Sequence, residues 1–260
     1  MLIEQLQMDS WLTWALPFVR ALAMLTLIPF ALSPVPLNVR ITLALFLGFA
    51  AIPAVSVPSA GIDTFGLLGL IVGEVVAGVV MGFSVAIVYQ IAIAAGGMIS
   101  AEMSLTQSNI FNPSTNQRDP IMAVPLGQLV TLLIFATGAH YHILYAYIRS
   151  FAIAPPGRII PDEASMVFLI GQTSKIFMIS AQMAAPFIAG NFIVIFAFSI
   201  LGRSVPSINV FMLSFPVRIL VGFILLGTTA ALMARYLMHP AEETPERMLR
   251  ALPAATLQAR

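Results

Sequence analysis

Long apolar segments separated by short polar turns make up most of the chain. They are Trp11 to Leu32, Ile41 to Val57, Thr64 to Ala101, Ile121 to Ile148, Ala164 to Leu201 and Ser207 to Met238. A helix that crosses a bilayer needs about 20 apolar residues, and most of these segments reach that length. The pattern predicts an all-α integral membrane protein, because a helix satisfies its own backbone hydrogen bonds within lipid. After Met238 the sequence becomes polar and mixed in charge, and we expect a loosely ordered tail over residues 239–260.

Two of these segments, Thr64 to Ala101 and Ala164 to Leu201, are each 38 residues long. As one helix, such a segment would measure about 57 Å, whereas the hydrocarbon core of a bilayer is only about 30 Å thick. The lengths and the proline breaks together predict kinked or half-length helical hairpins. Hairpins of that kind are stable only when they are buried against other protein. We therefore expect a single domain over residues 1–260 that works as a subunit of a larger assembly.

The longest polar interruption between two apolar segments is GGMISAEMSLTQSNIFNPSTNQRDP, from Gly96 to Pro120. We expect Gly96 and Gly97 to open it as a hinge, and a loop of Ser, Thr, Asn and Gln to follow. The hydrophobic pair Ile110-Phe111 lies at its middle, which is unusual for a disordered linker. Loops of this length are usually functional or disordered. Two interpretations stay open: a solvent loop that joins two spans, or an inserted plug in which Ile110-Phe111 forms a hydrophobic constriction.

The composition agrees with a membrane protein and excludes several kinds of chemistry. The chain is 59% hydrophobic and 9% charged, with a mean hydropathy of +0.97, whereas soluble domains are about a quarter charged. The formal net charge of +1 gives no basic field for nucleic acid. The absence of cysteine excludes disulfides, thiolate metal sites and cysteine nucleophiles.

A few ionisable residues lie within or beside the apolar segments. The candidates for buried charges or assembly contacts are Arg20, Glu74, Glu102, Lys175 and Arg203. A charge at membrane depth should face protein or water. Glu74 lies on a surface whose glycine pairs, Gly69/Gly73 and Gly78/Gly82, have the small-xxx-small spacing that lets helix backbones approach closely. These charges could form a proton or ion pathway, or they could pair between helices or subunits. The second interpretation is favoured, because no other carboxylate lies one turn from Glu74 to form a relay.

Enzyme and metal-site signatures are missing from the sequence. His140 and His142 are two residues apart, which places them on different faces of a helix. No cysteine and no nearby carboxylate completes the three or four ligands that zinc requires. No nucleophile motif and no nucleotide-binding loop occurs. We expect no enzymatic activity, no metal and no cofactor.

Three stretches of the chain resemble one known family, in the same order along the sequence. The first is RALAMLTLIPFALSPVPLNVRITLAL, from Arg20 to Leu45. The second is GGMISAEMSL, which leads through FNPSTNQRDP to the ATGAHYHI region. The third and most specific is AAPFIAGNFIVIFAFSILGRSVPSINVFMLSFPVRILVGF, from Ala184 to Phe223. Together they resemble the flagellar biosynthetic protein FliR family, whose members are export-gate subunits of type III secretion.

The resemblance implies a function and a set of partners that the residue pattern alone does not. A family member resembles a fused FliP-plus-FliQ unit and completes a helical export gate with FliP-like and FliQ-like subunits and an FlhB-like subunit. The gate lies in the bacterial inner membrane, in the flagellar basal body, among membrane lipids, and passes unfolded exported proteins but no nucleic acid. A loop in the middle of the chain plugs the pore. Here it corresponds to about Met103 to Pro120, with plug residues Ser108, Asn109, Ile110, Phe111, Asn112 and Pro113.

Three alternative functions stay open: an injectisome subunit, a transporter and an assembly scaffold. The virulence injectisome has a counterpart with the same fold and motifs. A small-solute or ion transporter would show inverted repeats around a charged midplane site, and the sequence contains no convincing internal repeat. An inert scaffold for assembly, without gating, is a further alternative.

Overall fold

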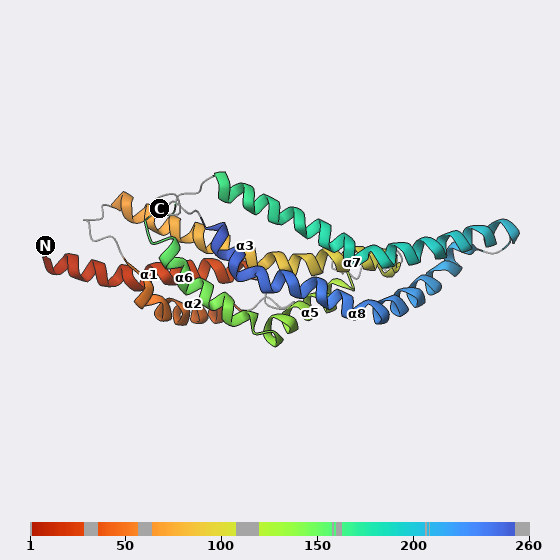
Figure 1. The fold of residues 1–260 in the computed structure, drawn as a ribbon, viewed down its shortest axis with the longest axis horizontal. Coiled ribbons are helices and arrows are strands. Elements are labelled where there is room, and N and C mark those ends of the chain that lie inside the picture. The colour runs from red at the N-terminus through yellow and green to blue at the C-terminus, as the bar shows by residue number, and fades with distance from the viewer. Residues whose placement is uncertain are drawn as a thin grey trace. The chain divides into compact units, whose positions relative to one another are not determined.

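A computed structural model of the chain describes residues 2–28, 36–56, 64–107, 120–157, 159, 163–205, 207 and 209–252. Every regular element among these residues is a helix (Figure 1). The α-helices are α1 (Leu2–Leu27), α2 (Leu37–Ala51), α3 (Thr64–Glu102), α5 (Ala123–Ala136), α6 (Ala139–Ile153), α7 (Glu163–Ser204) and α8 (Val210–Ala251). Two short 3-10 turns, η1 (Ile52–Ala54) and η2 (Leu105–Gln107), follow α2 and α3.

Several of these helices are suited to a membrane. Within the described part of the chain, four helical segments are long and apolar enough to cross a bilayer: Leu37–Ala54, α3, α7 and α8. A fifth is obtained if α5 and α6, which meet at an angle of 74°, count as one broken span. Gly138 allows this bend, because its backbone adopts a φ of 73° that favours glycine. The chain is an all-α membrane protein, as the hydropathy pattern predicted.

The two 38-residue segments differ from the prediction of kinked hairpins. Each forms one continuous helix, of 39 residues in α3 and 42 residues in α7. Pro186 lies inside α7 without ending it. The prediction compared segment length with bilayer thickness, but neither segment contains a polar turn that would end the helix, and Pro186 removes only one backbone N–H donor from α7. The bent hairpin occurs instead between α5 and α6.

The chain divides into two compact units, which are described separately. Unit 1 is drawn from residues 1–88, 134–173 and 241–260, and unit 2 from residues 89–133 and 174–240. Unit 1 packs α1, α2, α6 and the first part of α3 around one apolar cluster that includes Met24, Met81 and Tyr147. Gly78 permits the close contact of α3 with α1, since a Cβ at this position would lie 2.4 Å from the Arg20 carbonyl oxygen. This contact confirms the prediction made from the Gly78/Gly82 spacing.

The end of α8 belongs to the core of unit 1, which corrects the expectation of a loose tail over residues 239–252. The remainder of the predicted tail, residues 253–260, lies outside the described residues. The helix continues to Ala251, and Met248 and Leu252 lie buried in the apolar cluster. Met248 lies in the last turn of α8, and Leu252 follows the helix directly. Arg247 pairs with Glu243 on the same helix, so the mixed charge of this stretch stabilises α8. The tail looked polar because its apolar positions are few and regularly spaced.

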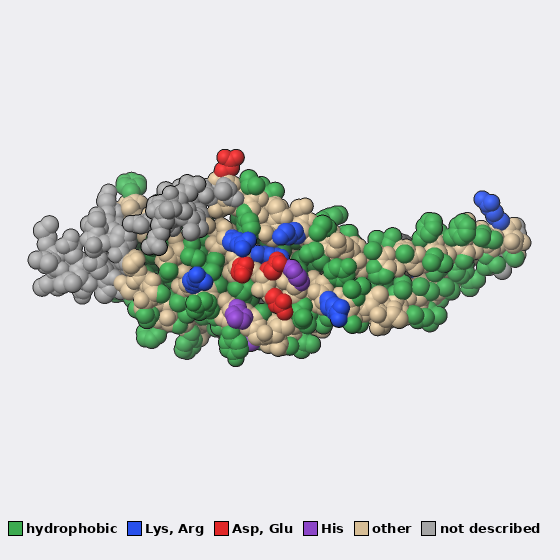
Figure 2. All heavy atoms as spheres, viewed as in Figure 1, with side chains coloured by type: hydrophobic (Ala, Val, Ile, Leu, Met, Phe, Trp, Pro, Cys, Tyr) green, Lys and Arg blue, Asp and Glu red, His purple; other side chains and the backbone are tan. Residues whose placement is uncertain are grey.

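Unit 2 contains the end of α3, most of α5, and the parts of α7 and α8 between residues 174 and 240. Ser180 of α7 donates a hydrogen bond to the Ile91 carbonyl oxygen of α3 at 2.9 Å. Much of the visible surface of the molecule is apolar, with few charged side chains (Figure 2). Only 17% of the most apolar window in α7 and 11% of that in α8 are buried, against 56% in α3. These two helices therefore depend on lipid or on other proteins to cover them.

Candidate functional site

A charged pair lies in the interior of unit 1. Arg20 of α1 donates from Nε to Glu74 Oε2 at 2.6 Å and from Nη2 to Glu74 Oε1 at 2.9 Å. Both side chains are completely buried. The two parallel bonds form a bidentate pair, which fixes the orientation of both side chains as well as attracting them.

Helix α6 and Ala154, the residue directly after it, supply the remaining contacts of the guanidinium. Arg20 Nη1 donates to Ser150 Oγ and Nη2 donates to the Ala154 carbonyl oxygen, both at 2.8 Å. The ring of Phe151 lies under the guanidinium, with its centre 3.9 Å from Cζ. Sequence reasoning did not identify these residues. The available signal was a single serine on an apolar helix face, since residues 147, 150, 151 and 154 share one face at helical spacing.

The arrangement is closed to further ligands. All three guanidinium nitrogens of Arg20 have an acceptor, and both oxygens of Glu74 have a donor. A satisfied pair of this kind connects α1, α3 and α6 and gives no open coordination position. Its geometry is that of a contact between helices, one of the two interpretations left open by the sequence.

The polar loop begins later than the sequence suggested. Gly96 and Gly97 do not open it, because α3 continues through both to Glu102. Gly96 instead permits a close crossing, since a Cβ there would lie 2.5 Å from the Ala123 backbone. The sequence offered a glycine pair, which is equally typical of a hinge and of a tight helix contact.

The two ends of the loop lie together in unit 2. The backbone N–H of Met122 donates to Ser100 Oγ at 2.9 Å, which ties the start of α5 to the last turns of α3. A Cβ at Gly97 would contact the Pro120 ring at 3.7 Å. The expected plug residues lie outside the described residues; they are Ser108, Asn109, Ile110, Phe111, Asn112 and Pro113.

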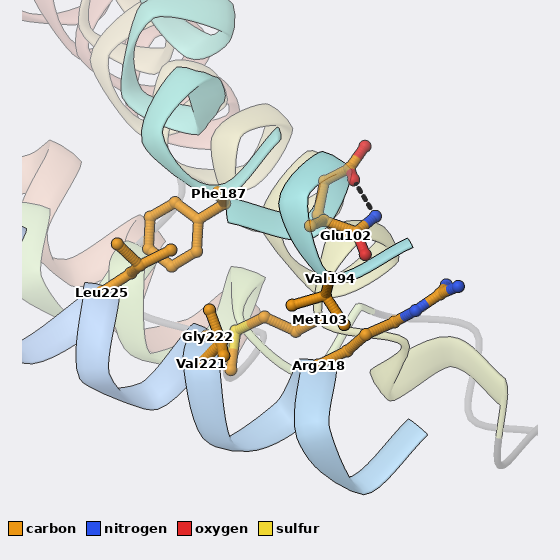
Figure 3. A pocket seen from close by; sticks show the side chains of 9 residues that line it. Glu102, Met103, Phe187, Val194, Arg218, Val221, Gly222 and Leu225 are labelled. Atoms are coloured by element: carbon orange, nitrogen blue, oxygen red, sulfur yellow. Dashed lines mark hydrogen bonds between the residues drawn. The ribbon is translucent and has the colours of Figure 1, made fainter. Parts of the chain in front are cut away.

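A small pocket lies at the base of the loop, within unit 2 (Figure 3). Met103 is buried and points from the end of α3 toward Gly222 of α8. Glu102 accepts a hydrogen bond from Asn191 Nδ2 of α7 at 2.5 Å. Arg218 of α8 donates from Nη1 to Ser104 Oγ at 3.4 Å. The turn after α3 is thus held by Asn191 of α7 and Arg218 of α8. The sequence analysis singled out Glu102 but neither of these two residues.

Lys175, Arg203 and His140 belong neither to the Arg20–Glu74 pair nor to this pocket. Lys175 and Arg203 are exposed on α7. His140 places Nδ1 3.3 Å from the Ile134 carbonyl oxygen and packs its ring 4.0 Å from that of Tyr141. Among the residues that the structure describes, no three His, Asp or Glu side chains gather as a metal site.

The fold and these sites define a class: an all-α membrane protein that carries a closed internal ion pair and a tethered polar loop. The family model of the bacterial export proteins, family 1, matches residues 11–244. The chain belongs to this family.

Characterised relatives cover most of the chain. The flagellar biosynthetic protein FliR of Escherichia coli is 25% identical over 240 residues, which are 90% of this chain and 92% of the relative. FliR of Bacillus subtilis is 29% identical over 223 residues, or 84% and 86% of the two chains. The Yop proteins translocation protein T of Yersinia pestis is 28% identical over 171 residues, or 65% and 66%.

Proposed function

We propose that this protein is a subunit of the flagellar type III export apparatus in the bacterial inner membrane. It completes a pore with FliP-like and FliQ-like subunits, next to an FlhB-like subunit in the basal body. The loop from about Met103 to Pro120 plugs this pore until an unfolded flagellar protein passes. The observation that carries the proposal is the family match over residues 11–244, together with the anchored base of the loop.

The exposed apolar face of α7 supports an assembly. It extends from Met166 to Leu201, which corresponds to about 53 Å of helix at 1.5 Å per residue. Membrane helices tilt by up to about 40°, which would still leave about 41 Å to cover along the membrane normal. The hydrocarbon core covers only about 30 Å. Part of this face therefore needs protein neighbours.

The described ends of the loop support the plug. Ser100 and Met122 join α3 to α5, and Met103 and Ser104 contact α8. A loop whose two ends are held by neighbouring helices can occupy one place reproducibly, which a plug requires. A freely hinged linker would need no such contacts.

The comparisons favour the flagellar branch over the injectisome. The two FliR relatives match 84–90% of this chain, whereas the Yop translocation protein T matches 65%. We therefore assign flagellar proteins as the exported substrates. A transporter function receives no support from the closed Arg20–Glu74 pair, which offers no free ligand position.

Deletion of residues 106–117 tests the proposal in cells that lack their own copy of the protein. We expect the complex to assemble and the inner membrane to leak ions, which a membrane-potential dye measures. The control replaces the same residues by Gly and Ser at equal length and separates the loss of side chains from the loss of length. Assembled complexes with no leak and normal export of flagellar proteins would contradict the plug.

A further inference from the structure

The turn after α3 fits into a notch on α8 that only glycine can provide. Met103 is 1% exposed, and a Cβ at Gly222 would lie 2.4 Å from its Cγ and 2.9 Å from its Sδ (Figure 3). Any other residue at position 222 would have to displace this side chain. Methionine is suited to this notch, because its unbranched side chain can enter and leave an irregular gap by rotation about its side-chain bonds.

The polar groups around the notch are only partly satisfied. Glu102 and Arg218 line the same pocket, yet each is bonded to a neutral partner: Glu102 to Asn191, and Arg218 to Ser104. Within the described part of the chain, Asn191 Oδ1 and Arg218 Nε are buried without a hydrogen-bond partner. Unsatisfied buried groups raise the free energy of the state that contains them.

Two further features indicate that this is a contact that can open and not a ligand-binding site. Ser104 adopts a φ of 58°, a conformation that is strained for a non-glycine residue. The cavity measures about 10 Å³, which leaves room for at most one water molecule. The turn is therefore held by a well-filled apolar contact while its polar contacts remain poor.

We propose that the Met103–Gly222 contact is a latch that must open during export. In the closed state Met103 occupies the notch. In the open state it leaves, and Arg218 exchanges Ser104 for Glu102, so that the two opposite charges pair. The new ion pair offsets the lost apolar contact, which gives the element two discrete arrangements. This inference rests on the proposed function, since it assigns the opening step of the same export gate.

The absence of cysteine from the chain allows a direct test in the assembled complex. The double variant Met103→Cys with Gly222→Cys places two thiols at the closed contact, where a disulfide can form if the Cβ atoms are about 3.5–4.5 Å apart. We expect oxidation to reduce export about tenfold or more, because the open state is removed from the population, and reduction to restore it. The matched control is Gly202→Cys with Val210→Cys, a contact between α7 and α8 outside the notch. Oxidation of this control should leave export unchanged.

Each outcome of this experiment either supports or overturns the latch. A disulfide that forms while export continues would overturn the latch, as would failure of the disulfide to form in assembled complexes. A block by both disulfides would also overturn it, because the effect would then be general stiffening. The loop deletion keeps the two proposals distinguishable. If the loop deletion causes an ion leak but the oxidised disulfide has no effect on export, the plug is supported and the latch is wrong. If the deletion causes no leak but the oxidised disulfide blocks export, the plug alone is rejected.

Discussion

Individual polar side chains are important for the stability of this protein, because the chain contains few of them. Arg20 and Glu74 are the clearest case, since each is fully buried and each satisfies the other. A buried ion pair contributes little net stability compared with apolar residues, but breaking it leaves a charge without compensation.

Loss of one partner should therefore cost more than loss of both. We expect Glu74→Ala to destabilise the protein by about 3–5 kcal/mol, whereas Arg20→Met combined with Glu74→Leu should cost clearly less. Ser150→Ala is the milder control, since it removes one acceptor from the guanidinium. Thermal unfolding of the detergent-solubilised complex measures all three. Equal losses for the single and the double replacement would show that the pair does not act as a unit.

Gly222 offers a second prediction at the level of one residue. Gly222→Ala should displace Met103 and raise the ion leak through assembled complexes, because the added Cβ would lie 2.4 Å from Met103 Cγ. Gly227→Ala lies on the same helix and meets no atom within 4 Å, so it should cause no leak. Conductance of membrane vesicles distinguishes the two. Identical leak from both variants would point to a general effect of alanine in α8.

At the scale of elements, helix contacts depend on glycines that the spacing only partly identified. Gly78 and Gly82 of α3 lie against α1, whereas Gly69 of the same glycine stripe meets nothing within 4 Å. The spacing predicts that small residues can form a contact, but the position of the neighbouring helix decides which of them do. The same reasoning applies to Gly96. The sequence predicted a hinge at this glycine, whereas in the fold it lets α3 pass close to the Ala123 backbone.

The contrast within α3 is testable. We expect Gly78→Ala to destabilise unit 1 by about 1–3 kcal/mol or more, since the Cβ would meet backbone atoms that cannot move aside. Gly69→Ala should be neutral or stabilise α3 by about 0.5–1 kcal/mol, because alanine favours the helix. The midpoint of thermal unfolding checks both variants. A larger loss for Gly69→Ala would mean that this glycine faces a partner in the assembly.

At the scale of the whole molecule, hydropathy determined the fold class and local packing determined the details. The all-α membrane character followed from segments that are too apolar for a soluble protein. Continuous α3 and α7 did not follow, because a helix longer than the bilayer is unfavourable only if lipid surrounds all of it. Ser150 of α6 and Ala154 directly after it lie 130 and 134 positions from Arg20 in the sequence, and no local pattern encodes such a contact.

The long apolar faces of α7 and α8 give a prediction about the isolated chain. We expect the protein expressed alone to aggregate or to be degraded, because part of its apolar surface extends beyond the reach of lipid. Expression with its FliP-like and FliQ-like neighbours should raise the yield of soluble complex in detergent, measured by size-exclusion chromatography. A stable monomer that transports a small solute would contradict the assembly and favour the transporter interpretation.

The most direct test of the central claim asks whether exported protein passes the loop. A photoreactive phenylalanine analogue at Phe111, in a complex with a stalled export substrate, should cross-link to that substrate on illumination. The same probe at Phe46, which is 71% exposed on α2, should cross-link to lipid or to neighbouring subunits only. Substrate cross-links at position 111 are the predicted result. Their absence, while the stalled substrate cross-links to other subunits of the pore, would contradict the placement of this loop in the export path.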